Sequence, residues 1–142
     1  VPLPQDDVVI NNAFVAGRTV TLDMPRAGKS INWTGATGTP AWAKTTATTV
    51  YGSVTMIAGM TNSGTTAFTM EGRGSFTWTS AGQTFTNSVT VQMIGGTLTM
   101  QDAYVGSSNI TLTNGTLDFN NFNSTMTNFQ LTNSNLVVSL II

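Results

Sequence analysis

Carboxylates are the strongest candidates for chemistry in this 142-residue chain, because it contains no histidine and no cysteine. A glycoside hydrolase places two carboxyl groups around the bond that it cleaves, and a Ca²⁺ site gathers several oxygen ligands. Asp118 is the outward residue of a repeated phrase, but the residues expected beside it are Thr99 and Val137. With no second carboxylate beside Asp118, we expect no catalytic residue, no metal site and no cofactor, and hence no enzyme.

The other charged residues fall in expected turns. Asp6 and Asp7 precede the first expected strand and are interpreted as an N-terminal cap or turn. Glu71 and Arg73 belong to "MEGRG", where we expect a solvated ion pair that contributes little to stability. One further loop, also interpreted as solvated, holds Asp23, Arg26 and Lys29.

Aromatic rings at the surface could stack on a sugar. Trp42 and Tyr51 lie outside the apolar pattern described below, and Tyr104 lies close to Asp102 in the sequence. Trp42, Tyr51 and Tyr104 are therefore the candidates for a glycan-binding site. Four other aromatic residues fall on inward positions and are assigned to the core: Trp33, Phe76, Trp78 and Phe119.

The composition excludes two kinds of partner. Charged residues are 8% of the chain, the net charge is −1, and no basic residue follows Arg73. Capture of nucleic acid needs several Lys or Arg side chains on one face, so no nucleic-acid partner is expected. No apolar run approaches the ~20 residues of a membrane span, so no membrane partner is expected either.

A short phrase returns at an even step, as "GSVTM" at 52–56, "GSFTW" at 74–78 and "GTLTM" at 96–100. Each copy contains two apolar residues separated by one other, which is typical of a strand with one buried face. The pairs recur every 19–23 residues, and seven phrases keep the pattern: Val8/Ile10, Ile31/Trp33, Val54/Met56, Phe76/Trp78, Leu98/Met100, Leu117/Phe119 and Leu136/Val138.

Two further series run between these pairs. Val20 and Leu22 look like an early member of the second series, whose next copy should fall near residue 44. The stretch "TPAWAKTTATT" has no clean apolar pair there, so we expect a loop or distorted turn. The later members are Phe68/Met70, Val89/Val91, Ile110/Leu112 and Phe129/Leu131, and the weaker third series is Met60, Phe85, Val105 and Met126.

These repeats predict one all-β domain over residues 1–142, a parallel β-solenoid (β-helix) with coils of about 19–23 residues and two to three short strands per coil. One coil cannot bury its apolar pairs alone, whereas stacked coils bury them in a continuous column. A β-sandwich also has short alternating strands, but it does not predict that one phrase returns every second or third strand. The outward Ser and Thr residues could form an ice-binding ladder, although Thr on a solvent face is also what β-propensity favours.

The two ends of the chain differ. Residues 1–7 contain Pro2 and Pro4, which lack a backbone donor and suit an N-terminal cap or arm. Residues 136–142 are apolar and uncharged, so we expect this segment to meet another chain or to continue into a further domain. The expected interface residues are Leu136, Val137, Leu140, Ile141 and Ile142.

The phrases "DDVVINNAFVAGRTVTLD", "INWTG", "VYGSVTMIAGM" and "TLTNGTLDFNN" resemble the Thr/Asn/Gly-rich β-solenoid domains of tailed-phage tail-fibre and virion proteins and of bacterial surface proteins. The resemblance implies a structural or adhesive part of a virion or cell surface, often trimeric. We therefore expect a non-enzymatic appendage module, with a homotrimer or a neighbouring virion or surface protein as partner. The alternatives are a carbohydrate-binding adhesion module, with a cell-surface glycan as partner, and a polysaccharide lyase or hydrolase fragment.

Overall fold

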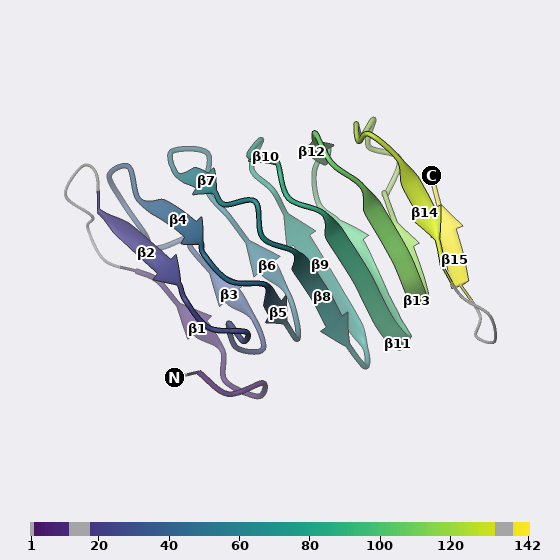
Figure 1. The fold of residues 1–142 in the computed structure, drawn as a ribbon, viewed down its shortest axis with the longest axis horizontal. Helices are drawn as coiled ribbons and strands as arrows, with labels where there is room; N and C mark the ends of the chain where they lie inside the picture. Colours follow the sequence, from purple (N-terminus) through teal and green to yellow (C-terminus); the bar gives the residue numbers. More distant parts are fainter. Residues whose placement is uncertain (1, 12–17, 133–137) are drawn as a thin grey trace.

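The computed structural model describes residues 2–11, 18–132 and 138–142, and every regular element in these residues is a β-strand. All strand pairs between them are parallel, and they stack into a solenoid of about six turns. In Figure 1 the coils follow one another from β1 at the N-terminal end to β15 at the C-terminal end. The predicted fold class is therefore confirmed.

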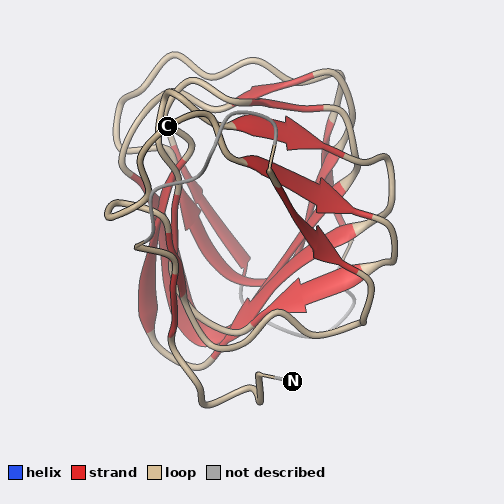
Figure 2. Ribbon diagram, turned by 90° about the vertical axis from the view of Figure 1, so that its left-hand side faces the viewer, coloured by secondary structure: helices blue, strands red, loops and turns tan. Residues whose placement is uncertain are grey.

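The strands lie on three faces, which Figure 2 shows in a view along the stack. Face 1 contains β1 (Val8–Val9), β3 (Ile31–Asn32), β6 (Val54–Thr55), β9 (Ser75–Thr79) and β15 (Val138–Ile141). Face 2 contains β2 (Thr19–Leu22), β4 (Ala41–Lys44), β7 (Thr61–Ser63), β10 (Thr84–Phe85) and β12 (Val105–Gly106). Face 3 contains β5 (Thr48–Val50), β8 (Phe68–Gly72) and β14 (Phe129–Leu131). Two long strands join face 3 to face 1: β11 (Val89–Met100) and β13 (Ile110–Asp118).

The core is a column of inward side chains, because alternate residues of each strand point inside. Leu98 pairs with Leu117 across β11 and β13, and both are buried, as the repeat predicts. On face 3 the predicted second series is in register from Phe68 through Val89 and Ile110 to Phe129. Of the aromatic residues assigned to the core, Trp33, Trp78 and Phe119 are buried, and Phe76 is partly buried against the core.

The predicted register is wrong at two places on face 1. Val54 pairs with Trp78, 24 residues later, and not with Phe76. The corner before β9 uses the extra residues: Phe76 packs there against Gly72, and the Thr77 N–H donates to Ser53 Oγ at 3.1 Å.

The last coil contains the second error. Leu117 pairs with Leu140 rather than with Leu136, which lies outside the described residues. The step between coils is 19 residues on face 3, from Ile110 to Phe129, but 23 residues on face 1. The inward column therefore passes to Leu140, which packs against the core of its own chain.

The stretch "TPAWAKTTATT" is also not a loop. It contains β4 and β5, and β4 pairs with β2 so that Trp42 faces Val20 and Lys44 faces Leu22. Trp42 and Lys44 are the missing pair, and both are buried. The apolar pattern could not find it, because one of its two inward residues is a lysine.

Gly115 allows two coils to approach closely at the corner between faces 3 and 1. Its φ is +79°, and a Cβ added there would collide with the Met93 carbonyl oxygen and lie 2.8 Å from the Gly96 carbonyl oxygen. Gly82 is a matched control, because its φ is +75° but no heavy atom lies within 4 Å of an added Cβ.

Replacement of either glycine by alanine should cost about 1–2 kcal/mol through the left-handed backbone alone. We expect Gly115→Ala to cost about 1–3 kcal/mol more than Gly82→Ala, because only Gly115 faces a collision. Urea denaturation of both variants measures the difference. Equal losses would contradict the close approach at Gly115.

Candidate functional site

Three of the acidic side chains bind backbone amides. Asp102 accepts hydrogen bonds from the Ser80 N–H at 2.8 Å and from the Ala81 N–H at 2.5 Å, and so ties one coil to the next. Asp6 accepts from the Leu3 N–H at 2.8 Å, and Asp118 from the Asn120 N–H at 2.7 Å. The ladder neighbours of Asp118 are Thr99 and Ile141, so the expected neighbour Val137 is replaced by another uncharged residue. These carboxylates act as local caps of the backbone.

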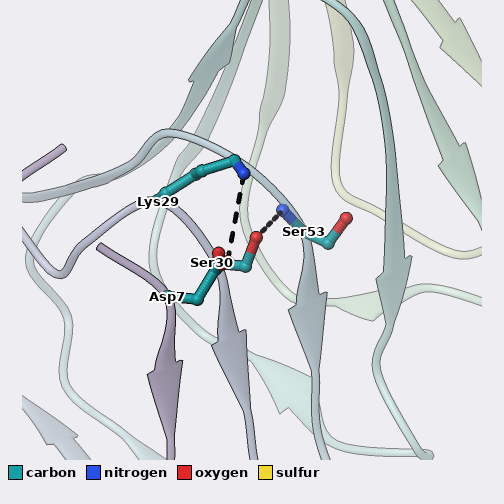
Figure 3. A network of polar contacts seen from close by, with 4 residues as sticks. All are labelled: Asp7, Lys29, Ser30 and Ser53. Atoms are coloured by element: carbon teal, nitrogen blue, oxygen red, sulfur yellow. Dashed lines mark hydrogen bonds and ion pairs between the residues drawn. The ribbon is translucent and has the colours of Figure 1, made fainter. Parts of the chain in front are cut away.

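Asp7 pairs with Lys29 at the first corner between faces 3 and 1 (Figure 3). The Lys29 Nζ and the Asp7 Oδ2 are 3.9 Å apart, and both side chains are about half exposed, so the pair contributes little to stability. Beside it the Ser53 N–H donates to Ser30 Oγ at 3.3 Å. This corner is a polar connection between coils.

Two searches gave no site in the part of the chain that the structure describes. No group of three or more His, Cys, Asp or Glu side chains there could hold a metal ion. No helix in those residues is long and apolar enough to span a membrane.

Trp42 and Tyr104 do not form the expected glycan platform. Trp42 is 1% exposed and Tyr104 is 0% exposed, so neither ring can meet a sugar at the surface. Both belong to an aromatic spine through the core, in which successive ring centroids are 4.9–6.2 Å apart: Trp33, Trp42, Phe68, Trp78, Phe85 and Tyr104. On face 2 the chain thus turns Tyr104 inward and leaves Val105 exposed, although Val105 was the predicted core residue.

Lys44 is a buried amine that sequence reasoning missed. Its Nζ lies 4.8 Å from the ring centroid of Trp42 and 5.7 Å from that of Phe85, and it donates to Asn62 Oδ1. The Asn62 side chain is itself held by a hydrogen bond from Nδ2 to the Thr84 carbonyl at 3.0 Å. Burial lowers the pKa of Lys44 to about 8, because no water stabilises the charged form. A lysine 22 residues before Thr66, whose hydroxyl binds the Lys44 carbonyl, is therefore part of the core.

Tyr51 is the remaining glycan candidate, and it lies in a groove where faces 3 and 1 meet. It follows Val50, which pairs with Met70 of β8, so Tyr51 lies beside Glu71 on the outer side of face 3. We call this the Tyr51 groove; it has a volume of about 270 Å³ and is lined by Pro4, Tyr51, Glu71, Gly72, Arg73 and Ile94. Glu71 and Arg73, expected as a simple turn pair, thus lie together with an aromatic ring.

The C-terminal end of the solenoid is an apolar hollow. It has a volume of about 400 Å³, and its walls include Phe119, Phe122, Phe129, Leu140 and Ile142. Ile142 is 81% exposed and Phe122 is 36% exposed, whereas Leu140 is partly buried. Of the other expected interface residues, Leu136 and Val137 lie outside the described residues, and Ile141 belongs to β15, which pairs with β13.

Comparisons with protein-family models, with curated proteins and with solved structures found no match to this chain.

The pKa of Lys44 makes stability depend on pH. Since this pKa is about 8 in the folded chain and 10.5 for a free lysine, the unfolded state binds more protons between these values, and stability rises with pH. We expect the free energy of unfolding to increase by about 2 kcal/mol from pH 8 to pH 10. Burial raises the pKa of Tyr104, which lowers stability above pH ~10 and sets the upper limit of this test.

Chemical denaturation at several pH values, compared with Lys44→Met, measures this contribution. The Lys44→Met variant should lose most of the pH dependence and be more stable than the parent chain at pH 7. Lys29→Met is the matched control, because Lys29 is about half exposed and should keep the dependence. The same slope in the Lys44→Met variant and in the parent chain would contradict the buried, destabilised charge.

Proposed function

We propose that this chain is a non-enzymatic structural module of a virion or extracellular cell-surface assembly, and that it binds further copies of itself through the C-terminal end of the solenoid. A homotrimer is the expected oligomer. The observation that carries the proposal is the contrast between the two ends, one charged and one apolar.

The N-terminal end carries features that oppose further strand addition. Pro2 and Pro4 precede β1 and lack backbone donors. Six of the chain's eleven charged residues lie within residues 6–29, and most of them are exposed: Asp6, Asp7, Arg18, Asp23, Arg26 and Lys29. Charged side chains and prolines at a sheet edge disfavour association.

The C-terminal end has the opposite chemistry. No charged residue follows Asp118 in the sequence. Within the described residues β14 and β15 each pair only with β13, so their outer edges offer unpaired backbone groups beside the apolar hollow. Burial of exposed side chains such as Ile142 and Leu131 would contribute about 1.5–3 kcal/mol each.

The enzymatic alternative receives less support. A lyase or hydrolase needs carboxylates that are free to contact substrate, whereas Asp6, Asp102 and Asp118 are each bound to backbone amides and Asp7 is paired with Lys29. A structural role uses these groups as they stand.

The test is the oligomeric state of the 142-residue chain at micromolar concentration, measured by sedimentation velocity. We expect an oligomer that dissociates when two exposed apolar residues of the hollow are replaced, as in the double variant Phe122→Ser/Ile142→Ser. Val9→Ser is the matched control, because Val9 is 61% exposed at the opposite end and its loss should leave the oligomer intact.

A monomeric parent chain would overturn the proposed assembly. Dissociation by Val9→Ser with no effect of the double variant would place the contact at the wrong end and would equally contradict the proposal.

A further inference from the structure

We propose that the Tyr51 groove binds one neutral pyranose unit of a carbohydrate. This binding does not depend on self-assembly, because the groove lies on the side of the solenoid, between faces 3 and 1, and the apolar hollow lies at its C-terminal end.

The register places three suitable side chains in a row on the outer side of face 3. Met70 pairs with Val50, and Glu71 pairs with Gln92, so Tyr51, Glu71 and Gln92 stand on neighbouring coils. Adjacent coils are spaced by about 4.8 Å, a distance that one sugar ring can span. An aromatic ring, a carboxylate and an amide therefore stand beside one another over the length of one ring.

The polar groups of this row are uncommitted. In the part of the chain that the structure describes, the side chains of Tyr51, Glu71, Arg73 and Gln92 make no hydrogen bond or ion pair with one another or with other residues. This differs from Asp7, Asp102 and Asp118, whose carboxylates are used locally. Polar groups that converge on a hollow without an internal partner are available to a ligand.

The surfaces of the groove match the two kinds of surface that a pyranose presents. Tyr51, Pro4 and Ile94 provide apolar walls for the C–H face of the ring. Glu71 accepts hydrogen bonds, Arg73 donates them in a planar fork, and the Gln92 amide can do both, which suits vicinal hydroxyl groups.

Charge decides between classes of sugar. The groove holds one carboxylate and one guanidinium, so it presents no net charge to a ligand. A uronic acid would bring its carboxylate close to Glu71, and that repulsion offsets the attraction to Arg73. The volume of about 270 Å³ is below the ~300–1,000 Å³ of drug-sized sites, which fits one sugar unit.

The test is a titration followed by NMR, with saturation transfer to the sugar as a second readout. The probes are the methyl glycosides of glucose, galactose and mannose as neutral sugars, and methyl glucuronide as the charged one, each to ~20 mM. We expect at least one neutral glycoside to bind with a dissociation constant in the low-millimolar range, as is typical of a ligand with about twelve heavy atoms in an open site.

Two variants test the residues, and two controls accompany them. Tyr51→Ala should abolish binding and Glu71→Gln should weaken it about tenfold, whereas Tyr51→Phe retains the ring and should bind. Thr69→Ala is the matched surface control, because Thr69 precedes Glu71 by two residues on β8 but does not line the groove. Glu71 is a surface residue, so its variant remains informative if the Tyr51→Ala variant does not fold.

Absence of binding by all three neutral glycosides would overturn the proposal. Unchanged binding by both the Tyr51→Ala and Glu71→Gln variants would overturn the assignment to this groove. Tighter binding of the glucuronide than of every neutral glycoside would overturn the neutral class.

Discussion

In-register stacking of inward side chains is the interaction on which the rest of this structure depends. A strand of two to five residues buries too little surface to be stable alone, and most strands here are that short. Each becomes stable because parallel pairing places its inward residue on the inward residues of the coils before and after it. The aromatic spine from Trp33 to Tyr104 is the strongest expression of this coupling, because its rings contact across coils and across faces.

The same constraint explains why much of the fold could be predicted. Where two coils have equal length, as from Val89 to Ile110, the sequence spacing is also the structural register. Prediction failed where the corners change length. The step of 24 residues from Val54 to Trp78 and the step of 23 from Leu117 to Leu140 are set by corner geometry, and an apolar pattern does not encode that geometry.

Two of the three glycan candidates failed for a related reason. Trp42 was considered exposed because its strand was not recognised, and the strand was not recognised because its second inward residue is Lys44. A buried lysine is tolerated there because two aromatic rings and the Asn62 oxygen surround its amine, and these partners come from other coils. Contacts of that kind can be recognised only after the register is known. Tyr51, by contrast, follows the inward residue Val50, so knowledge of β5 alone would have placed it on the outer side.

The irregular corner and the candidate binding site occur at the same place, and the constraint on stacking gives the reason. A perfect coil matches every backbone group and every inward side chain to the next coil, which leaves outward columns of small polar residues such as Thr69, Thr90 and Thr111. The corner before β9 departs from this plan: Gly72 makes room for the ring of Phe76, and the coil is lengthened relative to its neighbours. Charged and aromatic side chains that do not fit a uniform ladder can be accommodated there without interrupting the core. A concave surface with mixed chemistry therefore arises beside the change in register, and the Tyr51 groove lies there.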